Sequence, residues 1–164
     1  MASEQLVILR VDPLDPLSSL VFPAVSQRVL EMMRETMTEA DPILIVRQLL
    51  ARVAGGDPGI LLLAFVGPLS GRVRGHLLCT LETLGDSRWV YGWQAKVDGD
   101  GGDVLTRAFA QSDAWGASMG ATQFVMTTRR PEKAWERKYG FESMRHFMSR
   151  SVPHEAKGGD SASG

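Results

Sequence analysis

Hydrophobic residues follow two different spacings along this chain, and the change of spacing marks the predicted elements. The continuous apolar run at 59–66 is typical of a strand that is buried on both faces. Two segments of alternating pattern follow, at 72–84 and 88–97, and Gly85-Asp86 supplies a turn between them. The pattern therefore predicts an antiparallel meander at the centre of the chain.

Segments with apolar residues at helical spacing flank this meander. The predicted helices lie at 17–37, 41–54, 104–119 and 131–138, and the second of them begins at Asp41-Pro42 and stops at Gly55-Gly56. Further strands are predicted at 5–11, 124–127 and 141–152. The order is strand, two helices, three strands, helix, strand, helix, strand. It indicates an α+β fold, with a mixed, mostly antiparallel sheet flanked by helices.

Length and composition favour one domain. The chain has 164 residues and 44% of them are hydrophobic, which suits one core and is too little for two. We expect a single domain at 1–152. The segment 153–164 is rich in Gly, Ser, Lys and Asp and has little to bury, so it is expected to be a disordered tail.

Charge and cysteine content limit the classes of binding partner and the cellular compartment that we expect for this chain. The formal charge is −1, so the chain as a whole is not expected to bind nucleic acid or an anionic membrane. Its single cysteine, Cys79, lies in an apolar stretch, which is typical of a buried residue in a reducing compartment. With no apolar run of about 20 residues and no secretion signal, the sequence predicts a cytoplasmic protein.

The C-terminal third carries a resemblance to a known family. The segments that carry it are Asp113-Ala114-Trp115, Met119-Gly120-Ala121 and Arg137-Lys138-Tyr139-Gly140-Phe141. In these segments and in its order of elements, the chain resembles the GNAT superfamily of acyl-CoA-dependent N-acetyltransferases. It is also similar to diverged members encoded by bacteriophages, in which Thr127-Thr128-Arg129-Arg130 is typical after the fifth strand. For such a member, the cytoplasm would be that of the host cell.

The loop before the helix at 104–119 is the candidate cofactor site. A glycine-rich turn that opens a helix directs backbone N–H groups and the positive end of the helix dipole at a phosphate. The resemblance implies acetyl-CoA as the cofactor substrate, with no metal. The residues that it implies for cofactor binding are Ala95, Lys96, Val97, Gly99, Gly101, Gly102, Asp103, Val104 and Arg129.

The same loop also has features that oppose a phosphate. By the resemblance, Asp100 stands where the family has a basic or amide residue, and Asp103 and Leu105 stand where it has glycines. With Asp98, the loop places three carboxylates near a dianionic ligand. The alternative interpretation is an acidic turn in which Asp103 caps the helix and occupies its N–H groups. The Asp-Gly-Asp-Gly spacing lacks the distal Glu of a calcium loop, so we predict no metal.

The candidates for proton transfer are Glu82, Glu136 and Tyr139. Glu82 is a carboxylate on a predicted central strand, where family members often have a base, and Glu136 occupies the position of the family's tyrosine. Tyr139 directly precedes Gly140, where a packing residue is common. For each of these three, an ordinary surface or core role is the alternative. The period-two series Trp89, Tyr91, Trp93 is interpreted as half of the core or as the floor of a substrate groove.

Two functions follow from this sequence. The first is an enzyme that transfers an acetyl group from acetyl-CoA to a primary amine of a small molecule or protein, by direct attack in a ternary complex. The second is an inactive fold that serves as an interaction or virion-associated module. Exposed edges of a split sheet would make a homodimer plausible.

Overall fold

The computed structural model describes residues 4–36, 41–126 and 132–142. The chain divides into two compact units, Met1–Arg129 and Arg130–Gly164. The first unit holds β1 (Val7–Arg10), α1 (Pro16–Thr36), α2 (Asp41–Ala54), β2 (Ile60–Val66), β3 (Val73–Leu84), β4 (Ser87–Val97), α3 (Val104–Ser118) and β5 (Gln123–Met126). The second unit holds α4 (Glu132–Tyr139). Apart from Phe141 and Glu142, the strand predicted at 141–152 lies outside the described residues, as does the tail.

The described strands form one five-stranded sheet in the order β1-β2-β3-β4-β5. The first four strands are antiparallel neighbours, and β5 pairs with β4 in parallel. The α+β prediction is confirmed, and so is the central meander. Its turn at Gly85 has a φ of 60°, a left-handed conformation that glycine adopts without strain.

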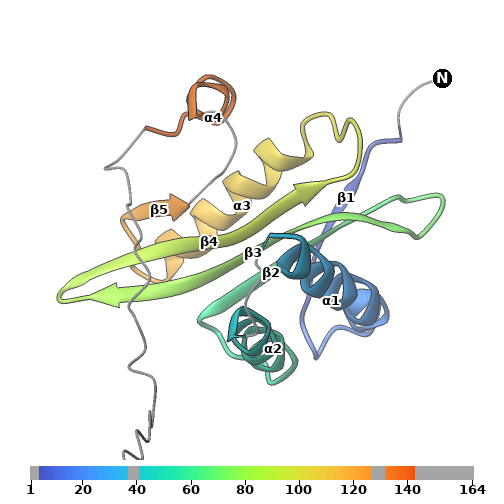
Figure 1. The fold of residues 1–164 in the computed structure, drawn as a ribbon, viewed down its shortest axis with the longest axis horizontal. Coiled ribbons are helices and arrows are strands. Elements are labelled where there is room, and N and C mark those ends of the chain that lie inside the picture. The colour runs from blue at the N-terminus through green and yellow to red at the C-terminus, as the bar shows by residue number, and fades with distance from the viewer. Residues whose placement is uncertain (1–3, 37–40, 127–131, 143–164) are drawn as a thin grey trace, which may run out of the picture. The chain divides into compact units, whose positions relative to one another are not determined.

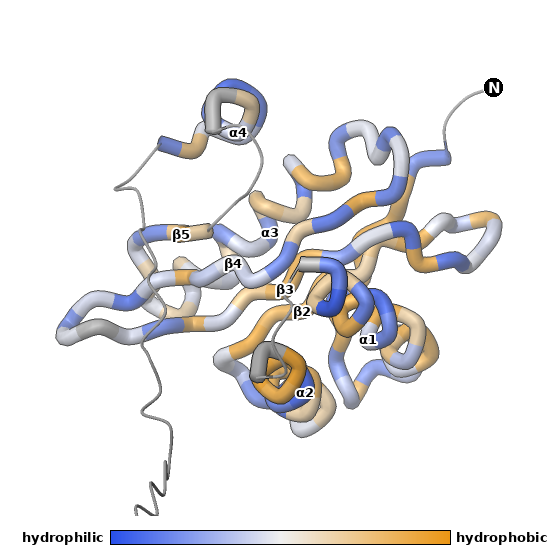
Figure 2. The backbone as a smooth tube through the Cα atoms, in the orientation of Figure 1, coloured by the Kyte–Doolittle hydropathy of each residue, from blue (hydrophilic) through white to orange (hydrophobic). Residues whose placement is uncertain are grey.

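Helices cover both faces of the sheet in the first unit (Figure 1). On one face, α1 and α2 pack on alternate residues of β2 and on Leu78 of β3 in a continuous hydrophobic cluster. On the other face, α3 lies against β4 so closely that a Cβ atom on Gly116 would collide with Val90. Figure 2 colours β2 as hydrophobic. Every residue of this strand is buried between these layers. This explains why β2 is apolar throughout while the outer strand β1 is not.

Candidate functional site

The pairing of β4 with β5 ends before β4 itself does. The described register stops at Gly92 opposite Met126, whereas β4 continues to Val97. The N–H of Asp98 donates to the carbonyl of Arg74 on β3 over 2.7 Å. Because backbone groups alternate in direction along a strand, the N–H groups of Ala95 and Val97 point away from β3, toward the side on which β5 lies. Within the described part of the chain, no strand pairs with the terminal part of β4 on that side, so its backbone donors are available to a ligand.

A β-bulge lies directly after the described pairing of β4 with β5. Leu78 of β3 stands opposite Gln94, but the next residue, Cys79, stands opposite Gly92, so Trp93 is the extra residue of β4. Bulges redirect side chains and end regular pairing, and they are frequent beside active sites. Gly92 leaves room for the ring of Phe124 on β5, because an added Cβ would lie 2.9 Å from its Cζ atom.

The loop from Asp98 to Asp103 then leads into α3. Gly99 and Gly102 both have φ of 60°, so the loop uses two left-handed turns that favour glycine. The Gly102 N–H donates to Oδ1 of Asp100 over 3.0 Å, and the Val104 N–H donates to the carbonyl of Gly101 over 3.2 Å. These two donors are therefore used within the loop.

The other N–H groups at this helix start are available. The first regular helical bond runs from the Arg107 N–H to the Asp103 carbonyl. Among the described residues, the N–H groups of Gly101, Asp103, Leu105 and Thr106 have no hydrogen-bond partner. Unpaired N–H groups at a helix N-terminus favour an anion, because the helix dipole adds to the hydrogen bonds.

Asp103 does not cap α3, so this part of the alternative interpretation is wrong. Its φ of −94° and ψ of 9° differ from the extended backbone of an N-cap, and its side chain makes no capping hydrogen bond. Its Oδ1 instead accepts from Nε of Arg107 over 3.0 Å, one turn along the helix. This ion pair directs the carboxylate along the helix surface, and the helix N–H groups remain open.

Two of the three loop carboxylates are neutralised by arginine. Asp103 pairs with Arg107, and Asp98 pairs with Nη2 of Arg28 from α1 at 2.6 Å. The hydrogen bond from Arg28 lowers the pKa of Asp98, and burial opposes that effect. Asp100 alone has no ion-pair partner among the described residues. The repulsion expected for a phosphate is therefore weaker than three free carboxylates would cause.

The side chains of two cations close to the loop, Lys96 and Arg107, are held by other parts of the protein. The side chain of Lys96 lies 3.5 Å from Glu35, and Arg107 also donates to the carbonyl of Leu6 over 2.8 Å. Both side chains are thus engaged within the protein. Arg74, which the sequence interpretation did not consider, donates to the carbonyl of Asp98 at 3.4 Å and lies beside the loop. Arg129 lies outside the described residues.

Glu82 is the one candidate for proton transfer whose surroundings are described in the first unit. Its carboxylate is exposed and accepts a hydrogen bond of 2.8 Å from Oγ1 of Thr80. Thr80 is fully buried, and its hydroxyl accepts the indole N–H of Trp93 over 2.8 Å. A chain of two hydrogen bonds therefore links Glu82 to the residue at the β4 bulge.

Glu136 and Tyr139 lie on α4, in the second unit. The Glu136 carbonyl accepts the N–H of Gly140, and its side chain is exposed. The ring of Tyr139 packs on Trp135 with their centroids 5.2 Å apart. These contacts are internal to that unit, and the catalytic roles of both residues stay predictions.

A buried polar pair, His76 and Gln94, lies between α1 and the sheet. His76 Nε2 and Gln94 Oε1 are 2.8 Å apart, and Nε2 of Gln94 donates to the carbonyl of Val29 on α1. His76 is wholly buried, and this burial lowers its pKa to about 4, so the ring is neutral at pH 7. The pair holds α1 to β3 and β4.

Within the described ranges 4–36, 41–126 and 132–142, no group of three or more His, Cys, Asp or Glu residues is placed to hold a metal ion. No helix in these ranges is long and apolar enough to cross a bilayer.

The arrangement of helices and strands in this chain resembles that of solved N-acetyltransferase structures. Glucosamine-6-phosphate N-acetyltransferase from Arabidopsis thaliana superposes with a TM-score of 0.64 at 13% identity, over 92% of this chain and 100% of that one. The chain has the fold of an N-acetyltransferase. An aminoglycoside 6'-N-acetyltransferase from Acinetobacter baumannii gives a TM-score of 0.63 at 14% identity, over 92% and 99% of the two chains.

A third structure, of a predicted acetyltransferase from Clostridium acetobutylicum, was determined with acetyl-CoA. It gives a TM-score of 0.65 at 10% identity, over 89% of this chain and 96% of that one. No protein-family model and no curated protein sequence matches the chain. The N-acetyltransferase fold is therefore recognised from the arrangement of the elements, at sequence identities too low to carry residue roles across.

Proposed function

We propose that the protein is an acyl-CoA-dependent N-acyltransferase that transfers an acetyl group from acetyl-CoA to a primary amine. The observation that carries this proposal is the set of open N–H groups at the start of α3. They follow an end of β4 that no described strand pairs with on the side of β5, within an N-acetyltransferase fold. The terminal N–H groups of β4 would hold the acyl and pantetheine part of the cofactor. Those of Gly101, Asp103, Leu105 and Thr106 would hold its phosphates.

The proposed transfer is direct. The neutral amine attacks the thioester carbonyl carbon, the tetrahedral intermediate collapses, and the C–S bond breaks to release the thiolate of CoA. The amine gives up a proton, for which Glu82 is the candidate acceptor, and the thiolate gains one. Backbone donors at Ala95 or Val97 would stabilise the carbonyl oxygen as it becomes negative. Cys79 supports direct attack, because it is the only cysteine and its burial raises the pKa of its thiol, which opposes nucleophilic reactivity.

The proposal is tested first by ligand binding. Titration with acetyl-CoA or CoA, followed by calorimetry and by thermal unfolding, should show one site per chain. At 100 times the dissociation constant, the ligand should stabilise the folded state by about 2.7 kcal/mol. If CoA at millimolar concentration causes no heat and no change in melting temperature, the enzyme proposal fails. The inactive interaction module would then be the better description.

Gly102→Glu tests whether the loop is the phosphate site. Gly102 has φ of 60° and open space around its Cβ position, so glutamate there places a carboxylate beside the helix N–H groups. We expect affinity for CoA to fall at least tenfold through repulsion and occlusion, measured by calorimetry. The matched control is Gly71→Glu, because Gly71 in the loop between β2 and β3 has φ of 68° and equally open space. Equal affinities of the two variants would contradict this site.

Glu82→Gln tests the proton acceptor. The amide keeps the size of the side chain and can still accept from Thr80, but it cannot take a proton at neutral pH. We expect kcat to fall by a factor of about 100 or more, while the dissociation constant of acetyl-CoA stays the same. Steady-state kinetics with an acetylated amine and calorimetry with acetyl-CoA measure the two effects. Full activity of the variant would remove Glu82 from the proposed mechanism.

A further inference from the structure

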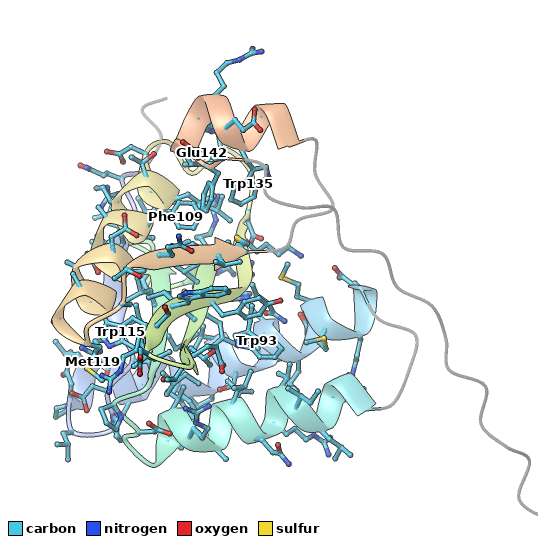
Figure 3. All side chains as sticks on the ribbon, turned by 90° about the vertical axis from the view of Figure 1, so that its left-hand side faces the viewer. Trp93, Phe109, Trp115, Met119, Trp135 and Glu142 are labelled. Atoms are coloured by element: carbon cyan, nitrogen blue, oxygen red, sulfur yellow. The ribbon has the colours of Figure 1, made fainter. Side chains whose placement is uncertain are left out.

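The face of the sheet covered by α1 and α2 carries an aromatic surface at the β3–β4 hairpin. Glu82 stands directly opposite Trp89, and Thr80 stands opposite Tyr91, so these four side chains share one face. The ring of Trp93 meets that of Tyr91 edge to face, with centroids 5.1 Å apart. All three aromatic residues are partly exposed. Figure 3 shows where Trp93 lies on the sheet.

Glu82 is held in place over this surface, and no described arginine or lysine neutralises its charge. Its Oε1 accepts the Thr80 hydroxyl, whose oxygen is itself fixed by the N–H of Trp93. Within the described part of the chain, no arginine or lysine forms an ion pair with Glu82. A fixed carboxylate beside aromatic rings is complementary to an ammonium group, which gains from the negative charge and from the faces of the rings.

This surface lies beside the proposed site of transfer. Tyr91 and Gly92 are opposite the last described residues of β5, and Trp93 is the bulge residue that follows them. Ala95, which offers a backbone donor, is two residues further along β4, or about 7 Å. An amine held near Trp93 and Glu82 would thus be within reach of an acyl group at the end of β4.

We infer that the acceptor is a cationic amine without a phosphate or carboxylate of its own, of the amino-sugar or polyamine kind, bound by Glu82 over Trp89 and Trp93. This inference rests on the proposed function and narrows its substrate class. An anionic group next to the amine would meet Glu82, and the described residues place no arginine or lysine in an ion pair with that carboxylate to offset the repulsion. Solved structures of this fold include enzymes for both kinds of acceptor, a sugar phosphate and aminoglycosides. The charge at Glu82 favours the second kind.

The test compares two ligands that differ only in the phosphate. Glucosamine and glucosamine-6-phosphate are titrated by calorimetry into the protein saturated with CoA, with sisomicin as a polycationic amino sugar. We expect sisomicin to bind most tightly, and glucosamine to bind at least about fivefold more tightly than its phosphate. Added salt should weaken the binding of sisomicin. Equal or tighter binding of the phosphate would overturn the inference.

Variants test whether this surface binds the amine. Glu82→Gln and Thr80→Val should each weaken sisomicin about fivefold or more and leave the affinity for CoA unchanged, whereas Thr80→Ser, which keeps the hydroxyl, should restore binding. The control is Asp86→Asn, an equal change of charge at an exposed position on the same hairpin, which should bind sisomicin as the wild type does. Wild-type affinity in Glu82→Gln would overturn the inference.

The amine titrations separate this inference from the proposed function. If CoA binds and no amine shows the expected preference, the acceptor inference fails and the transferase proposal stands. If CoA does not bind, the transferase proposal fails. The amines are then titrated into the protein alone, and a missing preference for sisomicin over glucosamine-6-phosphate would still overturn the inferred cation site.

Discussion

Lowering the pH from 7 to 5 should remove about 2 kcal/mol from the free energy of unfolding through His76 alone. Burial lowers the pKa of His76 from 6.5 to about 4. Below pH 6.5 the unfolded chain therefore binds a proton at this residue that the folded protein does not bind. The loss begins near pH 6.5, grows as the pH falls, and reaches about 3 kcal/mol near pH 4, where the folded state also takes up the proton.

Two carboxylates act in a lower range of pH. Arginine partners lower the pKa values of Asp57 and Asp98 from 3.8, so their contribution is lost only as the pH falls below about 3.8. Burial raises the pKa of Asp113 above 3.8, so this group acts at higher pH than they do and has the opposite sign to His76, because the folded state gains stability as Asp113 takes up its proton. A variant without the ring of His76 keeps the contribution of Asp113 and therefore isolates that of His76.

His76→Gln provides the comparison. A glutamine amide can donate to Oε1 of Gln94 in place of the ring N–H, and it has no proton to gain in this range. Urea unfolding at pH 7 and at pH 5 should show a loss of about 2 kcal/mol for the wild type and little of that loss for the variant. If the two proteins lose the same stability over this interval, the ring of His76 is not held neutral by burial.

Phe65→Ala should destabilise the protein by about 3–5 kcal/mol. Phe65 is fully buried near the C-terminal end of β2, on the face opposite the cluster under α1 and α2. Its ring covers Gly75, its partner on β3, since a Cβ there would lie 2.7 Å from Cδ2 of Phe65. Alanine would remove the ring and leave a cavity over a residue that has no side chain to fill it.

The measurement is thermal or urea unfolding, with Leu69→Ala as the control. Leu69 lies in the next loop and is 93% exposed, so its truncation should change stability by less than about 0.5 kcal/mol. For a protein of this size, we expect the melting temperature of Phe65→Ala to fall by roughly 10 °C. A loss of less than about 1 kcal/mol would mean that the ring contributes little to the core.

Local patterns in the sequence predicted the elements well. Strand β2 and the turn at Gly85 could be predicted from the sequence. The spacing of apolar side chains and the conformation of glycine depend on residues that are neighbours along the chain. The same is true of the helix that follows the glycine-rich loop. The strand predicted at 141–152 lies almost wholly outside the described residues and stays a prediction.

The position of the loop before α3 was predicted from the sequence, and its contacts were predicted less well. The sequence placed a glycine-rich loop before α3, but it left open whether Asp103 caps the helix. The structure decided this, because Arg107 holds the carboxylate of Asp103 elsewhere. The sequence also indicated three repelling carboxylates, whereas Arg28, 70 residues away along the chain, neutralises Asp98. No local pattern contains such a contact.

The sequence by itself determined the order of elements, the position of the loop and the apolar interior, because all three follow from spacing and residue type over short stretches. Only the tertiary structure decided which donors at α3 are open, that Thr80 and Trp93 hold Glu82, and that His76 is buried against Gln94. These features depend on where folding brings distant strands and helices together. Charge, hydrogen bonding and burial at a site are properties of that arrangement.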